Sequence, residues 1–154
     1  MQPSNANLRS SSYYIAHAHA QCERCNRSSR VVALALPPGH ETRIDGSWQR
    51  AEANAFIFYV AGLASSVSRL LHQAAPLYSR KSGEGRRNPY WANHCEHCGS
   101  MFDDEVLHCE PGGFMPTHPA EAEAILLNQV TEEFSADAAG YALDPEYFSL
   151  IRTR

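Results

Sequence analysis

Two short stretches, Cys22-Glu23-Arg24-Cys25 and Cys95-Glu96-His97-Cys98, contain four of the five cysteines in this chain of 154 residues. Two residues separate the cysteines of each pair, so both thiolates can reach one ion from a single tight turn. Two such turns that meet in space complete a tetrahedral site and leave no coordination position open. The sequence therefore predicts one structural metal site made by Cys22, Cys25, Cys95 and Cys98.

The residue after each pair suits the sharp turn that a metal-binding knuckle requires. Gly99 adopts a positive φ at no steric cost, and Asn26 belongs to the other residue type that enters the left-handed region readily. Apolar segments that favour β-structure flank both pairs. They cover residues 13–15 and 31–36 around the first pair, and 90–91 and 106–107 around the second. We therefore expect a knuckle hairpin at each pair.

This succession of hairpin, knuckle and hairpin resembles the zinc-ribbon family over residues 13–36 and 88–109. The runs 93–99 and 107–113 are also similar to zinc-ribbon proteins of an uncharacterised bacterial type, from which no activity carries over. The resemblance implies one structural Zn²⁺ held by the two knuckles. The chain departs from compact ribbons in placing 69 residues between Cys25 and Cys95. Residues 37–88 are therefore expected to form a structured insert of the same domain.

Three other roles for the four cysteines compete with zinc binding: iron binding, redox chemistry and disulfide formation. Iron in a rubredoxin-like site is the main alternative, because two such knuckles bind iron readily and metal supply often decides between the ions. A redox-active CxxC would open a helix after a strand, whereas extended or polar residues follow both pairs here. No segment near Met1 has the basic start, apolar core and cleavage site of a secretory signal. A cytoplasmic, reducing compartment without disulfides is therefore expected.

The remaining Cys and His residues give weaker signals. Cys109 stands alone, and a lone cysteine is most often a small buried apolar residue. His17 and His19 share one face of an expected strand. With His94, His97 or His108 they would build a second metal site only if three or four ligands converged. Half-exposed polar positions are the favoured interpretation. His108 and Cys109 point to opposite sides of an expected strand, so they make no nucleophile and base pair, and an enzyme is less favoured.

Charge is segregated along the chain, whose formal net charge is −4. Residues 88–151 contain no Lys or Arg and carry a formal −12, while the remaining residues carry +8. A basic cluster in a Ser- and Gly-containing loop consists of Arg80, Lys81, Arg86 and Arg87. Such a loop can contact phosphates, but no aromatic residues are interleaved and the acidic half repels nucleic acid. We expect a binding or regulatory module with a protein partner, and a nucleic-acid-binding protein is the alternative.

Local patterns predict an α+β fold, a small antiparallel sheet built on a zinc ribbon with two knuckle hairpins and one or two helices. Strands are expected near residues 12–20, 30–36, 89–94, 101–108 and 130–134, and helices near 63–74 and 119–128. We expect a disordered N-terminal segment at 1–11, one domain at 12–134 and a C-terminal tail at 135–154 that is irregular or a short helix. No apolar run approaches the roughly 20 residues that span a bilayer, so no membrane partner is expected.

Overall fold

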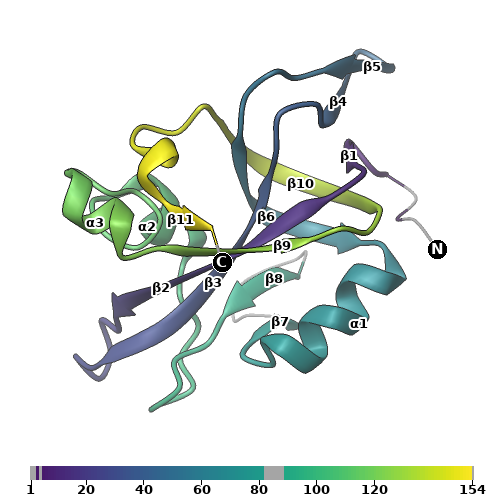
Figure 1. Ribbon diagram of the computed structural model, residues 1–154. Coiled ribbons are helices and arrows are strands. Elements are labelled where there is room, and N and C mark those ends of the chain that lie inside the picture. Colours follow the sequence, from purple (N-terminus) through teal and green to yellow (C-terminus); the bar gives the residue numbers. More distant parts are fainter. Residues whose placement is uncertain (1–2, 4, 82–88, 154) are drawn as a thin grey trace.

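The computed structural model describes residues 3, 5–81 and 89–153, and Figure 1 shows a large twisted sheet with helices beside it. Among the described residues, strands account for 46% and helices for 17%. Within this part of the chain, eleven strands join in one mixed sheet. The expected small antiparallel sheet on a zinc ribbon is therefore wrong, because segments far from the knuckles supply most of the strands.

Nine of the strands in the described chain form a continuous path across the sheet. Their order is β11 (Arg152–Thr153), β9 (Leu126–Val130), β2 (Tyr13–Gln21), β3 (Ser28–Leu36), β6 (Ala55–Leu63), β10 (Phe134–Leu143), β1 (Leu8–Ser10), β4 (Glu41–Ile44) and β5 (Ser47–Arg50). The β11–β9 pair is parallel, which makes the sheet mixed. Off this path, β8 (Tyr90–Asn93) pairs antiparallel with both β6 and β7 (Tyr78–Lys81). As a result β6 lies beside β3 along its first residues and beside β8 further on.

The central strand β3 is buried on both faces, and its side chains divide the core into two clusters. Val32, Leu34 and Leu36 face a cluster that includes Val67 and Leu71 of the helix α1 (Ser65–Ala74). The alternate residues 31, 33 and 35 face a second cluster. This second cluster includes residues from α2 (Asp104–Cys109), α3 (Pro119–Glu123) and the 3-10 helix η1 (Phe148–Leu150). Helical segments therefore cover both faces of the sheet (Figure 1), and Cys22 and Cys95 belong to the cluster on the α2 side.

Residues 104–109 form the helix α2 where the sequence pattern led us to expect a strand. The side chain of Asp103 accepts a hydrogen bond from the backbone N–H of Glu105 at 2.9 Å and caps the helix. Asp104 and Glu105 then place negative charge in the first turn, where the helix dipole favours it. The capping signal of Asp103 outweighs the β-leaning Val106 and Leu107. The strand-based separation of His108 from Cys109 is consequently also wrong.

The residues after Phe134 continue the long strand β10 (Phe134–Leu143) and do not form the irregular or short helical segment that their composition suggested. The strand β10 pairs with β6 over most of its length and with β1 at its start. A side chain at Gly140 would overlap the ring of Phe58, so the small residues of β10 serve close packing against β6. β1 lies inside the predicted N-terminal segment 1–11, and β10 crosses the boundary predicted at residue 134. The division into residues 1–11, 12–134 and 135–154 stays a prediction.

Candidate metal centre

Both CxxC pairs lie in loops with the same backbone hydrogen bonds. In the first loop, Cys22 N–H donates to the Arg27 carbonyl at 2.9 Å and Asn26 N–H donates to the Cys22 carbonyl at 2.8 Å. The second loop repeats this arrangement from Cys95 to Ser100 and from Gly99 to Cys95, at 2.8 and 3.0 Å. Asn26 has φ 60° and Gly99 has φ 77°. The expected positive φ after each pair is therefore confirmed. The two loops are knuckles with the same backbone hydrogen bonds.

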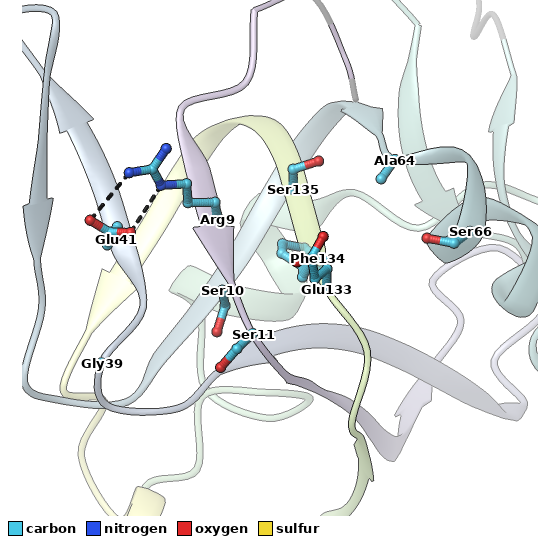
Figure 2. A pocket seen from close by; sticks show the side chains of 10 residues that line it. All are labelled: Arg9, Ser10, Ser11, Gly39, Glu41, Ala64, Ser66, Glu133, Phe134 and Ser135. Carbon is cyan, nitrogen blue, oxygen red and sulfur yellow. Dashed lines mark hydrogen bonds and ion pairs between the residues drawn. The ribbon is translucent and has the colours of Figure 1, made fainter. Parts of the chain in front are cut away.

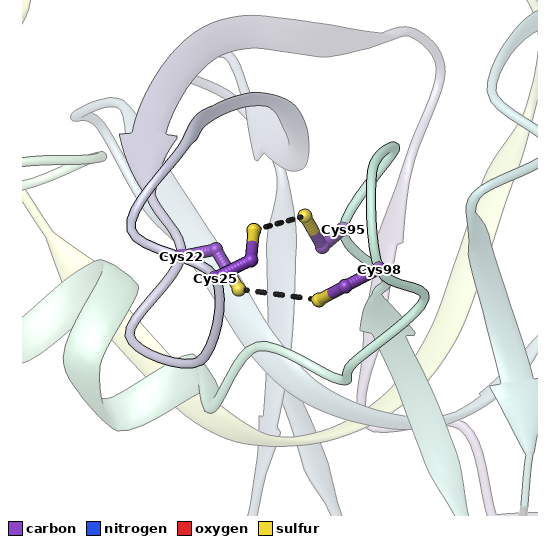
Figure 3. Close-up of side chains that lie close together, drawn as sticks. All are labelled: Cys22, Cys25, Cys95 and Cys98. Carbon is purple, nitrogen blue, oxygen red and sulfur yellow. Dashed lines mark hydrogen bonds between the residues drawn. The ribbon is translucent and has the colours of Figure 1, made fainter.

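The two knuckles face each other, and their four sulfur atoms converge (Figure 3). All four Sγ atoms lie within 4.8 Å of one another. The closest pairs join different knuckles: Cys22 to Cys98 and Cys25 to Cys95, each at 3.7 Å. In a tetrahedron with metal–sulfur bonds of about 2.3 Å, two sulfurs are about 3.8 Å apart. A disulfide would bring two sulfurs to about 2.05 Å. The four thiols therefore have the spacing of a metal site and could hold one ion.

Contacts from the second knuckle to the start of β3 hold the two loops in this position. The carboxylate of Glu96 accepts a hydrogen bond from the backbone N–H of Arg30 at 2.6 Å. The backbone N–H of Glu96 donates to the hydroxyl of Ser29 at 3.0 Å. His97 places its ring Nε2 3.0 Å from the carbonyl of Ser28. The Arg30 N–H and guanidinium lower the pKa of Glu96 and keep its carboxylate ionised. The loops are therefore docked by protein contacts in addition to any shared ion.

Asn93 also joins the segments that carry the two knuckles, through hydrogen bonds between its side chain and the backbone of β3. The side-chain amide of Asn93, at the end of β8, exchanges two hydrogen bonds with the backbone of Val32 in β3, both at 2.8 Å. Asn93 is buried and so acts as a substitute for a strand residue between β3 and β8. Sequence reasoning did not single it out. The available signal was an Asn at the end of an apolar strand, where this residue type is depleted.

The electrostatics of the four sulfurs favour a bound cation. Hydrogen bonds with the hydroxyl and the backbone of Ser100 lower the pKa of Cys98 to about 6. Burial acts to raise the pKa of Cys95, but backbone N–H groups in its own loop outweigh burial and lower it. The Arg27 N–H acts to lower the pKa of Cys25, yet burial and the neighbouring sulfurs raise that pKa to about 11. Four thiolates this close need a positive charge among them, which a divalent metal ion supplies.

The cysteine cluster contains none of the other sequence-predicted candidates. The four cysteines form the one cluster of at least three Cys, His, Asp or Glu residues, among those described, that could hold a metal. His17 and His19 line one shared cavity, with His17 Nε2 2.8 Å from Asn128 Nδ2. Cys109 is exposed at the end of α2, so the expectation of a buried residue is wrong.

The basic cluster predicted for nucleic-acid binding is only partly described. Arg80 is exposed in β7, and its Nε donates to the Pro89 carbonyl at 3.4 Å. Lys81 is the last residue of β7. Arg86 and Arg87 lie outside the described residues. The two described members therefore belong to a strand that pairs with β8 and not to a separate loop.

No protein-family model matches the chain, and no curated protein or solved structure matches it either. No helix in the described part of the chain has both the length and the apolar character needed to cross a membrane. The convergence of the cysteines is consistent with a zinc site, while no family match identifies a zinc ribbon.

Proposed function

We propose that Cys22, Cys25, Cys95 and Cys98 bind one structural Zn²⁺ and that the protein is a binding or regulatory module. The observation that carries this proposal is the approach of all four Sγ atoms to within 4.8 Å of one another. Four thiolates complete the coordination of Zn²⁺ and leave no position for water or a substrate. The ion would stabilise the fold by joining the β2–β3 hairpin to the segment that follows β8.

Zinc is favoured over iron because a closed four-thiolate site is the usual structural Zn²⁺ site. A rubredoxin-like iron site has the same four ligands in the same arrangement. The iron-loaded protein is coloured, whereas the zinc-loaded protein is colourless. Protein expressed in medium that contains both metals should carry one zinc per chain and show no absorption in the visible range. A red protein with stoichiometric iron would contradict the zinc assignment.

The ligand assignment is tested by paired cysteine substitutions. Cys95→Ser should release the metal, because Cys95 is buried within the tetrad. Cys109→Ser is the matched control, since Cys109 is exposed and lies outside the tetrad. Metal content should fall below one tenth of the wild-type value in Cys95→Ser and stay unchanged in Cys109→Ser. The reverse pattern would overturn the assignment of the ligands.

The partner of this module is proposed to be a protein. The formal −12 of residues 88–151 favours a basic protein surface and repels nucleic acid. Binding to DNA or RNA should therefore be weak at physiological salt. A submicromolar, salt-sensitive complex with nucleic acid that is abolished by neutralising Arg80, Lys81, Arg86 and Arg87 would favour the alternative function.

A further inference from the structure

A second candidate site lies where α1 begins, away from the cysteine residues. A cavity of about 500 Å³ is lined by residues of β1, β4, β10 and the first turn of α1 (Figure 2). Its volume falls within the range of about 300–1,000 Å³ that is usual for small-molecule sites. Polar side chains dominate its wall, including Ser10, Ser66 and Ser135. The cavity is therefore suited to a small polar ligand.

The first turn of α1 offers this cavity hydrogen-bond donors that no side chain caps. The helix starts after Ala64, which has no side chain able to cap it, and the first turn contains no acidic residue. The Ser68 N–H donates to the Ala64 carbonyl at 3.0 Å. The N–H groups of residues 65–67 precede this bond and point out of the helix end. Such an end attracts anionic groups, because the helix dipole adds to its free N–H donors.

Ser135 supplies the second, independent observation. This side chain is 3% exposed, and its Oγ is buried without a hydrogen-bond partner in the structure. Its backbone carbonyl accepts the N–H of Ala64 at 3.1 Å, which places it beside the start of α1. Figure 2 shows the Ser135 hydroxyl on the cavity wall, directed towards Ala64. An unpaired buried hydroxyl costs free energy unless a ligand or water satisfies it.

The charges of the cavity define what else a ligand must carry. Arg9 is already paired with Glu41, through contacts of 2.9 Å from Nε and 3.4 Å from Nη2. Glu133 also lines the cavity and forms no ion pair with another described residue. The three charged side chains therefore sum to a formal −1. A multiply charged anion such as phosphate would be repelled by Glu133, whereas a ligand with one anionic and one cationic end matches both the helix end and this carboxylate.

We propose that this cavity binds a small zwitterion of the amino-acid class, with its carboxylate at the α1 N-terminus and Ser135 and its ammonium group towards Glu133. The proposal is independent of the metal centre. The ligand carboxylate would accept hydrogen bonds from the free N–H groups of α1 and from the Ser135 hydroxyl. Glu133 would supply the negative charge that selects a zwitterion over a simple anion.

Glycine is the probe for the first test, because it carries both charged groups and no side chain. Titration of ¹⁵N-labelled, metal-loaded protein with glycine should shift the amide signals of Ser66 and Ser135 at millimolar concentrations. Acetate and methylammonium, which each carry one of the two charges, should bind at least about tenfold more weakly. The proposal is overturned if glycine causes no shifts at these residues, or if acetate binds as well as glycine.

Substitutions separate ligand binding from a structural role of Ser135. Ser135→Ala removes an unpaired hydroxyl, so the melting temperature of the ligand-free protein should stay the same or rise by a few degrees. Glycine affinity should fall about tenfold, since a hydrogen bond to a carboxylate is lost. Ser79→Ala is the matched control, because Ser79 Oγ is also buried and unpaired but does not line this cavity.

Glu133→Gln tests whether the ammonium group of the ligand lies towards Glu133. It should weaken glycine binding and leave acetate binding unchanged or stronger, because only the ammonium group depends on the lost charge. A loss of glycine affinity in Ser79→Ala equal to that in Ser135→Ala would contradict the proposed site. Equal binding of glycine by Glu133→Gln and the wild-type protein would contradict the proposed orientation of the ligand.

Discussion

The imidazole of His108 stacks on the ring of Phe58, with ring centroids 4.6 Å apart and ring planes inclined by 13°. The same imidazole also stacks on the ring of Phe114, with ring centroids 5.2 Å apart and ring planes inclined by 20°. The ring thus packs against two Phe side chains, and neither side chain has an atom that accepts a hydrogen bond from a protonated imidazole. Burial lowers the pKa of His108 to about 3, so this residue is neutral at physiological pH.

The depressed pKa of His108 predicts how stability depends on pH. An unfolded chain protonates this histidine near pH 6.5, whereas the folded protein does so only near pH 3. Between these values the unfolded state binds more protons, so the free energy of unfolding falls as the pH drops from 6.5 towards 3. The contribution is at most about 1.4 kcal/mol per pH unit. Urea denaturation at a series of pH values measures this slope.

Two variants isolate the contribution of His108 from that of other titrating groups. His108→Phe keeps a stacked ring without a basic nitrogen and should reduce the slope between pH 6.5 and 4. His72→Gln removes an exposed histidine of α1 and serves as the comparison substitution. If the His108→Phe protein loses stability with falling pH as steeply as the wild type, the neutral, desolvated imidazole is not a source of the effect.

Removing the metal should loosen the two knuckles before it disturbs the centre of the sheet. The proposed ion joins loops that are separated by 69 residues in the chain, whereas β10 is held by extensive pairing with β6. After chelation, hydrogen exchange should accelerate most over residues 22–30 and 93–101 and least over β10. Uniform acceleration across the whole chain would instead mean that the metal is required for global folding.

Gly99→Ala should strain the second knuckle without a steric clash. Gly99 has φ 77°, and a side-chain carbon built there meets no atom within 4 Å. The substitution therefore costs conformational free energy, about 1–2 kcal/mol for an alanine in the left-handed region. The variant should bind the metal more weakly in a competition titration with a chromogenic chelator.

Gly46→Ala is the matched control for this strain. Gly46 has φ 80° in the turn between β4 and β5, and an added side-chain carbon there also meets no atom within 4 Å. The two variants should lose similar stability, but only Gly99→Ala should lose metal affinity. Equal metal affinities in both variants would show that the turn after Cys98 does not control the position of its sulfur.

The cysteine spacing was sufficient to predict the convergence of the tetrad, because the chemistry of a knuckle is local. Two residues between cysteines and a residue tolerant of positive φ after them, Asn26 or Gly99, define the loop whatever surrounds it. The helix at 65–74 was also predictable, since its apolar residues recur at helical spacing and Pro76 follows it. These features depend on neighbours in the sequence.

The extent of the sheet was not predictable in this way, because it depends on pairing between distant segments. The sequence of β10 is rich in Ala and contains Gly140, which gives it low β-propensity. Its place beside β6 comes from the close fit between Gly140 and Phe58. α2 was missed for the opposite reason, since the local cap at Asp103 was present in the sequence but residues 101–108 were expected to form a strand.

Asn93 shows most directly how long-range contacts complete the metal centre. Its buried amide satisfies both the N–H and the carbonyl of Val32, so Asn93→Ala would leave two buried backbone groups without partners. The expected loss is about 2–5 kcal/mol in the free energy of unfolding. Because Asn93 lies two residues before Cys95, the same change should also weaken metal binding.

Asn7 provides a control with the same bonding at a distant position. Its amide donates to the Ala138 carbonyl at 2.8 Å and accepts the Ala138 N–H at 3.0 Å. Asn7 is half-buried, so Asn7→Ala should cost less, about 1–2 kcal/mol. Denaturation in parallel with chelator competition should show that both variants are destabilised and that Asn93→Ala alone binds the metal more weakly. Metal affinity that is unchanged in Asn93→Ala would mean that the docking of Glu96 and His97 on β3 positions the second knuckle without the Asn93 bridge.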